Sequence, residues 1–148
     1  MFKHILIATD GSELAGQAVL QGLALARKLD AAATVVTVTG LWSAVDMAAK
    51  MQSGDQHPIE DFEKRAAERA QEILSDASAT ARNMGFACKT IHVPDQHPAD
   101  GINATAEKEG CDLIIMASHG YRGVKRVLLG SVANEVLARS TVPVLIHR

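Results

Sequence analysis

The segment DLIIMASHGYRGVKRVLLGSVANEVL, residues 112–137, joins a strand pattern to a helix pattern through a loop rich in glycine. Residues 112–117 form a short apolar run, which is typical of a parallel strand covered on both faces. A helix pattern follows over residues 131–139. The loop between them contains three glycines, one histidine and three basic residues, more than a connection alone requires. The segment therefore predicts a strand, a functional loop and a helix.

The same alternation of strand and helix patterns runs along the whole chain. The segments expected as strands are residues 3–9, 33–39, 86–93, 112–117 and 142–147. The segments expected as helices are residues 12–29, 59–84, 98–109 and 131–139. Such alternation favours a parallel sheet with helices on both faces, and right-handed crossovers make the doubly wound strand order 3-2-1-4-5 the simplest arrangement. We therefore expect a single Rossmann-like α/β domain with a five-stranded sheet over residues 1–148.

Residues 40–58 interrupt the alternation, with a helical turn expected at residues 45–51. Trp42, Met47 and Met51 in this excursion either cover a pocket or a partner, or form a loosely packed lid over the core. Both alternatives stay open at this stage.

Charge and hydropathy exclude several classes of function. The formal net charge is −2 at pH 7, so no overall field attracts nucleic acid or an anionic membrane. No apolar run approaches the ~20 residues of a membrane helix, and the first residues lack the layout of a signal peptide. His57, His92 and His97 do not have the compact spacing of metal ligands. We expect a cytoplasmic protein without a metal site of its own.

The expected strand order places the switch point of the sheet between the first and fourth strands. Ligands of such sheets bind at the carboxyl ends of the strands beside that point, which here are residues 8–12 and 117–123. Glycines allow close approach of the backbone, and a helix that starts at Ser131 directs N–H donors to one place, which suits phosphate. The loop matches neither the P-loop nor the dinucleotide fingerprint. Asp10 is a second candidate, although it can equally cap the first helix together with Ser12.

Three segments of the chain resemble the universal stress protein family: ILIATDGS (residues 5–12), the segment 112–137 and PVLI (residues 143–146). The resemblance covers the whole chain and implies a fold like that of the adenine nucleotide alpha hydrolases. In nucleotide-binding members of the family, a G-x2-G-x9-G-[ST] loop holds the ribose and phosphates of ATP. Here Ala117 stands at the first glycine, and Gly120 and Gly130-Ser131 match the rest.

The resemblance implies that ATP, or another adenine nucleotide, binds with Mg²⁺ or Mn²⁺ carried by its phosphates. Asp10 and its two preceding residues would lie at the nucleoside end, Val38 at the adenine, Met116 and Ala117 at the ribose, and the loop at the phosphates. The nucleotide-binding residues implied in this way are Ala8, Thr9, Asp10, Val38, Met116, Ala117, His119, Gly120, Arg122, Gly130, Ser131 and Val132. Lys125 and Arg126 add local positive charge beside Arg122.

Ala117 is the departure from the family pattern. A methyl group at a left-handed backbone position costs roughly 1 kcal/mol, whereas an extended backbone tolerates it. The sequence leaves both conformations open.

The apolar C-terminal segment predicts a strand at the edge of the sheet. An uncovered apolar edge strand promotes aggregation unless it is paired. A second copy of the chain would pair with it by two-fold symmetry, and the resemblance implies the same homodimer. The residues expected at this interface are Val142, Val144, Leu145 and Ile146.

Three functions follow from these patterns. The leading hypothesis is a stress-response sensor or regulator that binds an adenine nucleotide. The alternative is a dimeric interaction module that has lost the nucleotide, which Ala117 favours. The third is slow ATP hydrolysis, but no general base or water-positioning residue is evident, so no residue is assigned a catalytic role.

Overall fold

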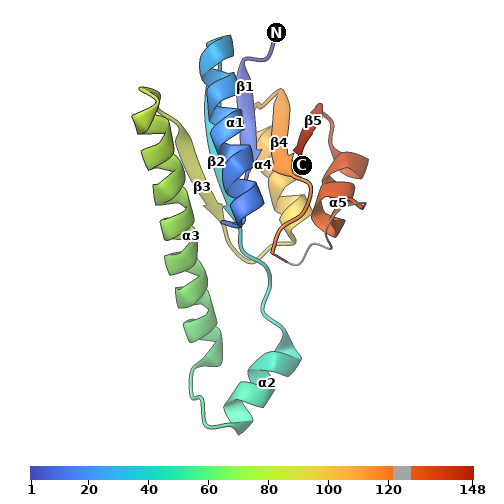
Figure 1. Ribbon diagram of the computed structural model, residues 1–148. Helices are drawn as coiled ribbons and strands as arrows, with labels where there is room; N and C mark the ends of the chain where they lie inside the picture. The colour runs from blue at the N-terminus through green and yellow to red at the C-terminus, as the bar shows by residue number, and fades with distance from the viewer. Residues whose placement is uncertain (122–127) are drawn as a thin grey trace.

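The computed structural model describes residues 1–121 and 128–148. Within these residues five parallel strands form one sheet in the order β3-β2-β1-β4-β5, which confirms the predicted topology (Figure 1). The strands are β1 (His4–Ala8), β2 (Ala32–Val38), β3 (Lys89–Val93), β4 (Leu113–Ala117) and β5 (Val144–His147). β1 and β4 are neighbours in register, with Ile7 opposite Ile115, so the carboxyl ends of these two strands meet as expected.

Helices cover both faces of the sheet. The helices are α1 (Glu13–Leu29), α2 (Ala44–Gln52), α3 (Pro58–Asn83), α4 (Pro98–Glu109) and α5 (Ser131–Arg139). α1 and α3 pack on the face that carries Ile7 and Ile115, whereas the opposite face carries Leu6 and Ile114 in the cluster shared with α4 and α5. Because both faces are covered, β4 is apolar at every position and β1 at every position after His4.

The two edge strands are shorter than the sequence pattern indicated. β3 begins at Lys89 and β5 at Val144, in place of the expected starts at residues 86 and 142. At β5 the reason is chemical, since Pro143 has no N–H for a ladder and contributes only its carbonyl, which accepts from the backbone N–H of Ile114 (3.0 Å).

α2 is longer than the expected helical turn and lies apart from the sheet. Ser43 caps it by accepting from the backbone N–H of Asp46, and Met47 is buried where α2 packs on α3. In Figure 1, α2 lies beyond the end of the sheet, beside the start of α3. The expectation of a lid over the core is therefore wrong, because these apolar residues pack against α3 or are exposed.

A close approach between α4 and β2 shapes the region at the carboxyl ends of the strands. A Cβ atom added to Gly101 would lie 2.9 Å from Cγ1 of Val38, so only glycine allows α4 to lie this close. The contact places the first turns of α4 beside the end of β2.

No helix in the described ranges has both the length and the apolar character that crossing a membrane requires.

Candidate functional site

An open cavity of about 490 Å³ lies at the carboxyl ends of β1 and β4. Every predicted nucleotide-binding residue that the structure describes lines it: Ala8, Thr9, Asp10, Val38, Met116, Ala117, His119, Gly120, Gly130, Ser131 and Val132. Arg122 lies outside the described residues, as do Lys125 and Arg126. The structure thus brings the described residues together around one space, and their contact with a nucleotide stays a prediction.

The cavity also has an apolar wall that the sequence analysis largely missed. Val36 and Val38 of β2 form one part of it, and Pro98 and Ile102 of α4 form the other. The contribution of α4 to the cavity could have been predicted from the topology. Each crossover helix of a parallel sheet begins at the carboxyl edge, where the ligand site was expected. None of the described lining residues comes from segment 40–58, so the structure does not place that excursion over the cavity.

Asp10 joins the two turns that flank the cavity. Its Oδ1 accepts from the backbone N–H of Ser12 (2.9 Å), and its Oδ2 accepts from the backbone N–H of Tyr121 (3.3 Å). The helix cap is Ser12 alone, whose Oγ accepts from the backbone N–H of Ala15 (3.3 Å), so the expectation that Asp10 caps α1 is wrong. A Cβ atom on Gly120 would overlap the Asp10 carboxylate. A larger residue at position 120 would therefore displace the Asp10 carboxylate or the turn itself.

The first turn of α5 opens onto the cavity without a side-chain cap. Its N-cap is Gly130, and no described side chain accepts from the backbone N–H groups at this helix start. Ser131, Val132 and Ala133, the first residues of α5, all line the cavity. Helix N-termini carry partial positive charge and uncompensated N–H donors, so this end of the cavity favours an anion.

Gly130 also holds the loop against β4. Its backbone N–H donates to the carbonyl of Ser118 (2.7 Å), and a Cβ atom at this position would lie 3.1 Å from the same oxygen. A larger residue would push the start of α5 away from the end of β4.

His119 has a hydroxyl as its hydrogen-bond partner. Nδ1 of its ring lies 3.1 Å from Oγ of Ser118, a buried residue that also lines the cavity. Among the described residues, no carboxylate is hydrogen-bonded to this ring. The contact fixes the imidazole as a wall of the cavity.

The backbone of Ala117 has no positive φ, the conformation in which alanine would be strained. Ala117 is the last residue of β4, and its methyl group packs with Ala15 and Ala18 of α1. The methyl group therefore costs no backbone strain.

Residues 1–121 and 128–148 contain no group of three or more histidine, cysteine, aspartate or glutamate side chains that could hold a metal ion. Asp10 is the one carboxylate among the described lining residues.

Comparison with known proteins gives a consistent picture. The family model described as the universal stress protein family matches residues 1–148. Universal stress protein YxiE of Bacillus subtilis is 31% identical and is matched over 100% of both chains. The structure of hypothetical protein MJ0577 of Methanocaldococcus jannaschii superposes with a TM-score of 0.79 at 29% identity, covering 99% of this chain and 96% of that chain.

Two more distant solved structures contain adenine nucleotides. A universal stress protein in complex with cAMP has a TM-score of 0.70 at 23% identity and covers 99% of this chain and 97% of that chain. A universal stress protein from Archaeoglobus fulgidus in complex with dAMP has a TM-score of 0.68 at 19% identity and covers 100% of this chain and 98% of that chain. The fold, the sequence match over the full chain and the family model agree: the chain belongs to the universal stress protein family.

Proposed function

We propose that the chain binds an adenine nucleotide, with ATP as the leading candidate, and acts in the cytoplasm as a sensor or regulator of the stress response. The observation that carries the proposal is the first turn of α5, which lacks a side-chain cap and opens onto an apolar cavity beside Asp10. A phosphate at this turn would accept hydrogen bonds from backbone N–H groups and would interact favourably with the helix dipole.

The cavity offers an environment for each part of a nucleotide. The apolar wall formed by Val36, Val38 and Ile102 suits the flat face of a purine. Asp10 can still accept from a ribose hydroxyl, because each carboxylate oxygen has two lone pairs and only one backbone donor. The volume of about 490 Å³ falls within the range of small-molecule sites.

The cAMP and dAMP complexes of distant family members are consistent with an adenine nucleotide in this fold. For this chain we propose that Mg²⁺ or Mn²⁺ arrives with the phosphates of the ligand. Asp10 is the one carboxylate among the described lining residues, so the ion would depend mainly on phosphate and water oxygens.

The alternative is a dimeric interaction module without a nucleotide. Its main support was Ala117, on the argument that a methyl group would strain the loop or fill the ribose site. The part of that argument that concerns strain loses its basis, because Ala117 has no positive φ. The methyl group packs with Ala15 and Ala18, although Ala117 also lines the cavity, so we keep the interaction module as the second candidate. We assign no catalytic residue in either case.

The direct experiment is to purify the protein, denature it by heat and look for released adenine nucleotide by absorbance and mass spectrometry. Protein freed of ligand is then heated with and without ATP and Mg²⁺. A ligand that binds only the native state stabilises it by RT ln(1 + [L]/Kd), so ATP should raise the melting temperature. Unchanged melting and no heat of binding at millimolar ATP would refute the proposal.

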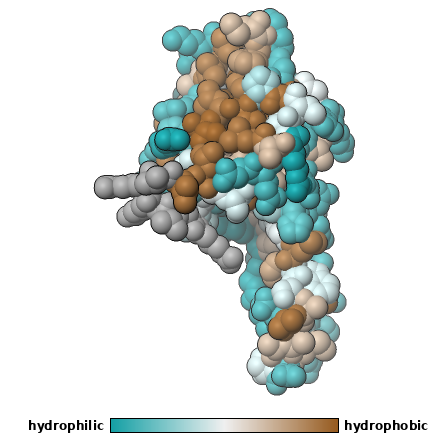
Figure 2. Space-filling view, turned by 90° about the vertical axis from the view of Figure 1, so that its right-hand side faces the viewer, coloured by the Kyte–Doolittle hydropathy of each residue, from teal (hydrophilic) through white to brown (hydrophobic). Residues whose placement is uncertain are grey.

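We also propose a homodimer formed by β5, which lies at one edge of the sheet. Figure 2 shows apolar side chains gathered on the face of the molecule where β5 and α5 lie in Figure 1. Leu145 is 41% exposed on this strand, whereas Val142, Val144 and Ile146 pack partly against the core. The backbone N–H of Val142 donates to Oγ of Ser140 (3.2 Å), so pairing would run through Val144–His147.

Leu145→Glu is the appropriate test of this dimer. The leucine is already exposed, so the variant should fold, while a carboxylate at the interface should give monomers in analytical ultracentrifugation. Val144→Glu is less informative, because Val144 also packs against the core of the monomer. A native protein that sediments as a monomer at micromolar concentration would overturn the proposal.

A further inference from the structure

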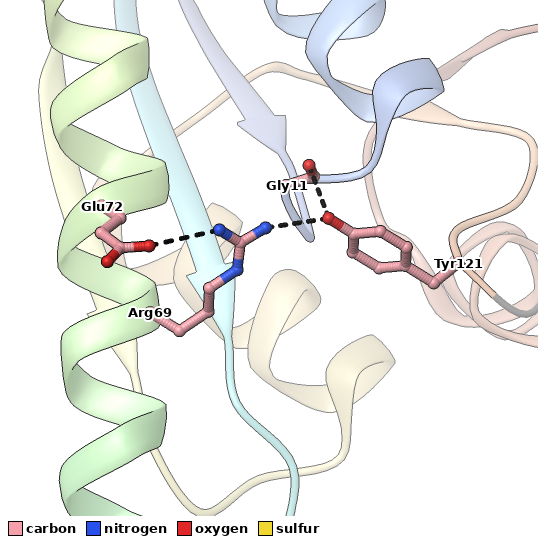
Figure 3. Close-up of polar contacts among 4 residues, drawn as sticks. All are labelled: Gly11, Arg69, Glu72 and Tyr121. Carbon is pink, nitrogen blue, oxygen red and sulfur yellow. Dashed lines mark hydrogen bonds and ion pairs between the residues drawn. The ribbon is translucent and has the colours of Figure 1, made fainter.

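A short chain of hydrogen bonds connects α3 to both turns that flank the cavity (Figure 3). The hydroxyl of Tyr121 donates to the backbone carbonyl of Gly11 (2.9 Å) and accepts from Nη2 of Arg69 (2.8 Å). Nη1 of Arg69 in turn donates to Oε2 of Glu72, one turn along α3 (3.3 Å). One phenol hydroxyl therefore holds together three segments that are far apart in the sequence. We call Gly11, Arg69 and Tyr121 the tyrosine clasp.

Tyr121 is the member of the clasp that lines the cavity. Its backbone N–H donates to Oδ2 of Asp10 (3.3 Å). The side chain thus binds the turn after β1 at Gly11, while the main chain binds the same turn at Asp10. Loss of the phenol hydroxyl would leave Asp10 as the remaining polar link from Tyr121 to this turn.

Gly11 makes this arrangement possible on the side of α3. Its φ is +80°, and a Cβ atom here would lie 2.7 Å from Cγ1 of Ile73 and 3.1 Å from Nη2 of Arg69. The turn after β1 is therefore packed directly against α3, which brings its carbonyl within reach of the phenol and places the guanidinium next to it.

The clasp lies at the surface, and this decides where its effect should appear. The side chain of Arg69 is 53% exposed and Tyr121 is 66% exposed. Exposed polar contacts of this kind contribute little to global stability. Such contacts instead lower how often the segments that they join open locally. Here those segments are the two turns beside the candidate ligand site.

We propose that Tyr121 and Arg69 are positioning residues of the ligand site: the clasp holds together the two turns beside a bound nucleotide and slows its release. This inference rests on the proposed function. Tyr121 acts through Gly11 and Asp10, and Arg69 acts only through the hydroxyl of Tyr121.

The test measures how fast a fluorescent adenine nucleotide leaves the protein when excess ATP is added in a stopped-flow instrument. Tyr121→Phe keeps the ring and removes the hydroxyl, and Arg69→Met keeps the length of the side chain and removes the guanidinium. We expect Tyr121→Phe to raise the dissociation rate constant about three- to tenfold, the effect of one or two weak hydrogen bonds, and Arg69→Met to raise it less. Glu72→Gln is the matched control, because it removes the charge beside Arg69 and leaves the bond to Tyr121 in place.

The double variant separates the clasp from independent effects of the two residues. Without the hydroxyl, Arg69 loses its hydrogen bond to Tyr121. Arg69→Met should therefore not change the dissociation rate constant further in the Tyr121→Phe background. A dissociation rate that is unchanged in Tyr121→Phe would overturn the proposal. An equal effect of Arg69→Met in both backgrounds would overturn it as well.

Hydrogen exchange distinguishes failure of the clasp from failure of the proposed function. If the native protein binds no adenine nucleotide, the proposed function fails, and the clasp is tested on the ligand-free protein. Tyr121→Phe should then speed exchange of the amides of Ser12 and Tyr121, which donate to Asp10, and leave that of Asp112, which donates to the carbonyl of His4. Unchanged exchange at Ser12 and Tyr121 would show that the clasp does not hold the turns.

Discussion

The two ends of the sheet differ in whether a helix start beside a cavity is left without a side-chain acceptor. At the amino end, Asp112 accepts from the backbone N–H groups of Lys3 (2.7 Å) and His4 (3.0 Å), and Lys89 pairs with Glu109 (2.6 Å). At the carboxyl end, the first turn of α5 has no side-chain cap in the described residues and faces a cavity. A parallel sheet creates this asymmetry, because every crossover helix begins at the carboxyl end and points its positive end there.

The comparison indicates that stability and ligand binding are separable in this molecule. At the amino end the Asp112 side chain accepts hydrogen bonds from backbone N–H groups, so substitutions there should change the free energy of unfolding. Glycines and helix N–H groups shape the carboxyl end, so substitutions there should affect the ligand. Three substitutions test this separation.

The largest effect is expected from Gly120→Ala. The added Cβ atom would overlap the Asp10 carboxylate, so either this carboxylate leaves its hydrogen bonds to Ser12 and Tyr121 or the turn moves, and both changes alter the cavity. We expect affinity for the nucleotide to fall about ten- to a hundredfold, in line with the strain of overpacking, as measured by isothermal titration calorimetry.

Gly16→Ala is the matched control for this variant. A Cβ atom at Gly16 meets nothing within 4 Å, and alanine favours the helix in which it lies. This control should keep native affinity and melt at a higher temperature. Native affinity in Gly120→Ala would show that the packing of this turn does not shape the ligand site.

An intermediate effect is expected from Asp112→Ala at the amino end. Burial raises the pKa of Asp112, but the backbone N–H groups of Lys3 and His4 outweigh this and hold the pKa below its usual value. Loss of these two contacts, one exposed and one part-buried, should lower the free energy of unfolding by about 1 kcal/mol in urea titrations at pH 7 and leave nucleotide affinity unchanged.

The pH dependence of this contribution has a definite sign. Because the folded-state pKa is lowered, the stabilisation is present above the unfolded pKa of roughly 4 and is lost as the pH falls through the folded value. The difference between native protein and Asp112→Ala should therefore shrink in acid. A difference that persists or grows below this range would contradict the assignment.

An effect on stability of similar size is expected from Ala117→Gly, which restores the family pattern. The change removes a buried methyl group from the cluster with Ala15 and Ala18 and adds backbone freedom to a strand. We expect the free energy of unfolding to fall by about 1 kcal/mol and the affinity for the nucleotide to stay within about twofold of native. An affinity more than tenfold higher in the variant would show that the methyl group does restrict the site.

Much of the fold is predictable from the sequence, for a physical reason. β1 and β4 are apolar at nearly every position because both faces of the sheet are covered, and helix patterns separate the strands. The residues at the carboxyl ends of these strands then had to meet. The turn expected at residues 45–51 matches α2 to within one residue at each end, but its packing on α3 was not predicted.

The details of the candidate site depend on packing that no local pattern encodes. The contact between Arg69 and Tyr121 joins residues 52 positions apart, and that between Tyr121 and Gly11 joins residues 110 apart. The backbone conformation of Ala117 was equally undetermined, since alanine occurs in both strands and turns. Such contacts follow only once the elements are assembled.

The most direct test of the central claim, that the carboxyl end of the sheet is a nucleotide site, is a titration of ¹⁵N-labelled protein with ATP and Mg²⁺ followed by amide chemical shifts. We expect the largest changes at the amides of Ser131, Val132 and Ala133, with Gly120 also affected and Asp112 at the amino end unchanged. Absence of shifts at millimolar ATP, or shifts concentrated at the amino end, would contradict the account.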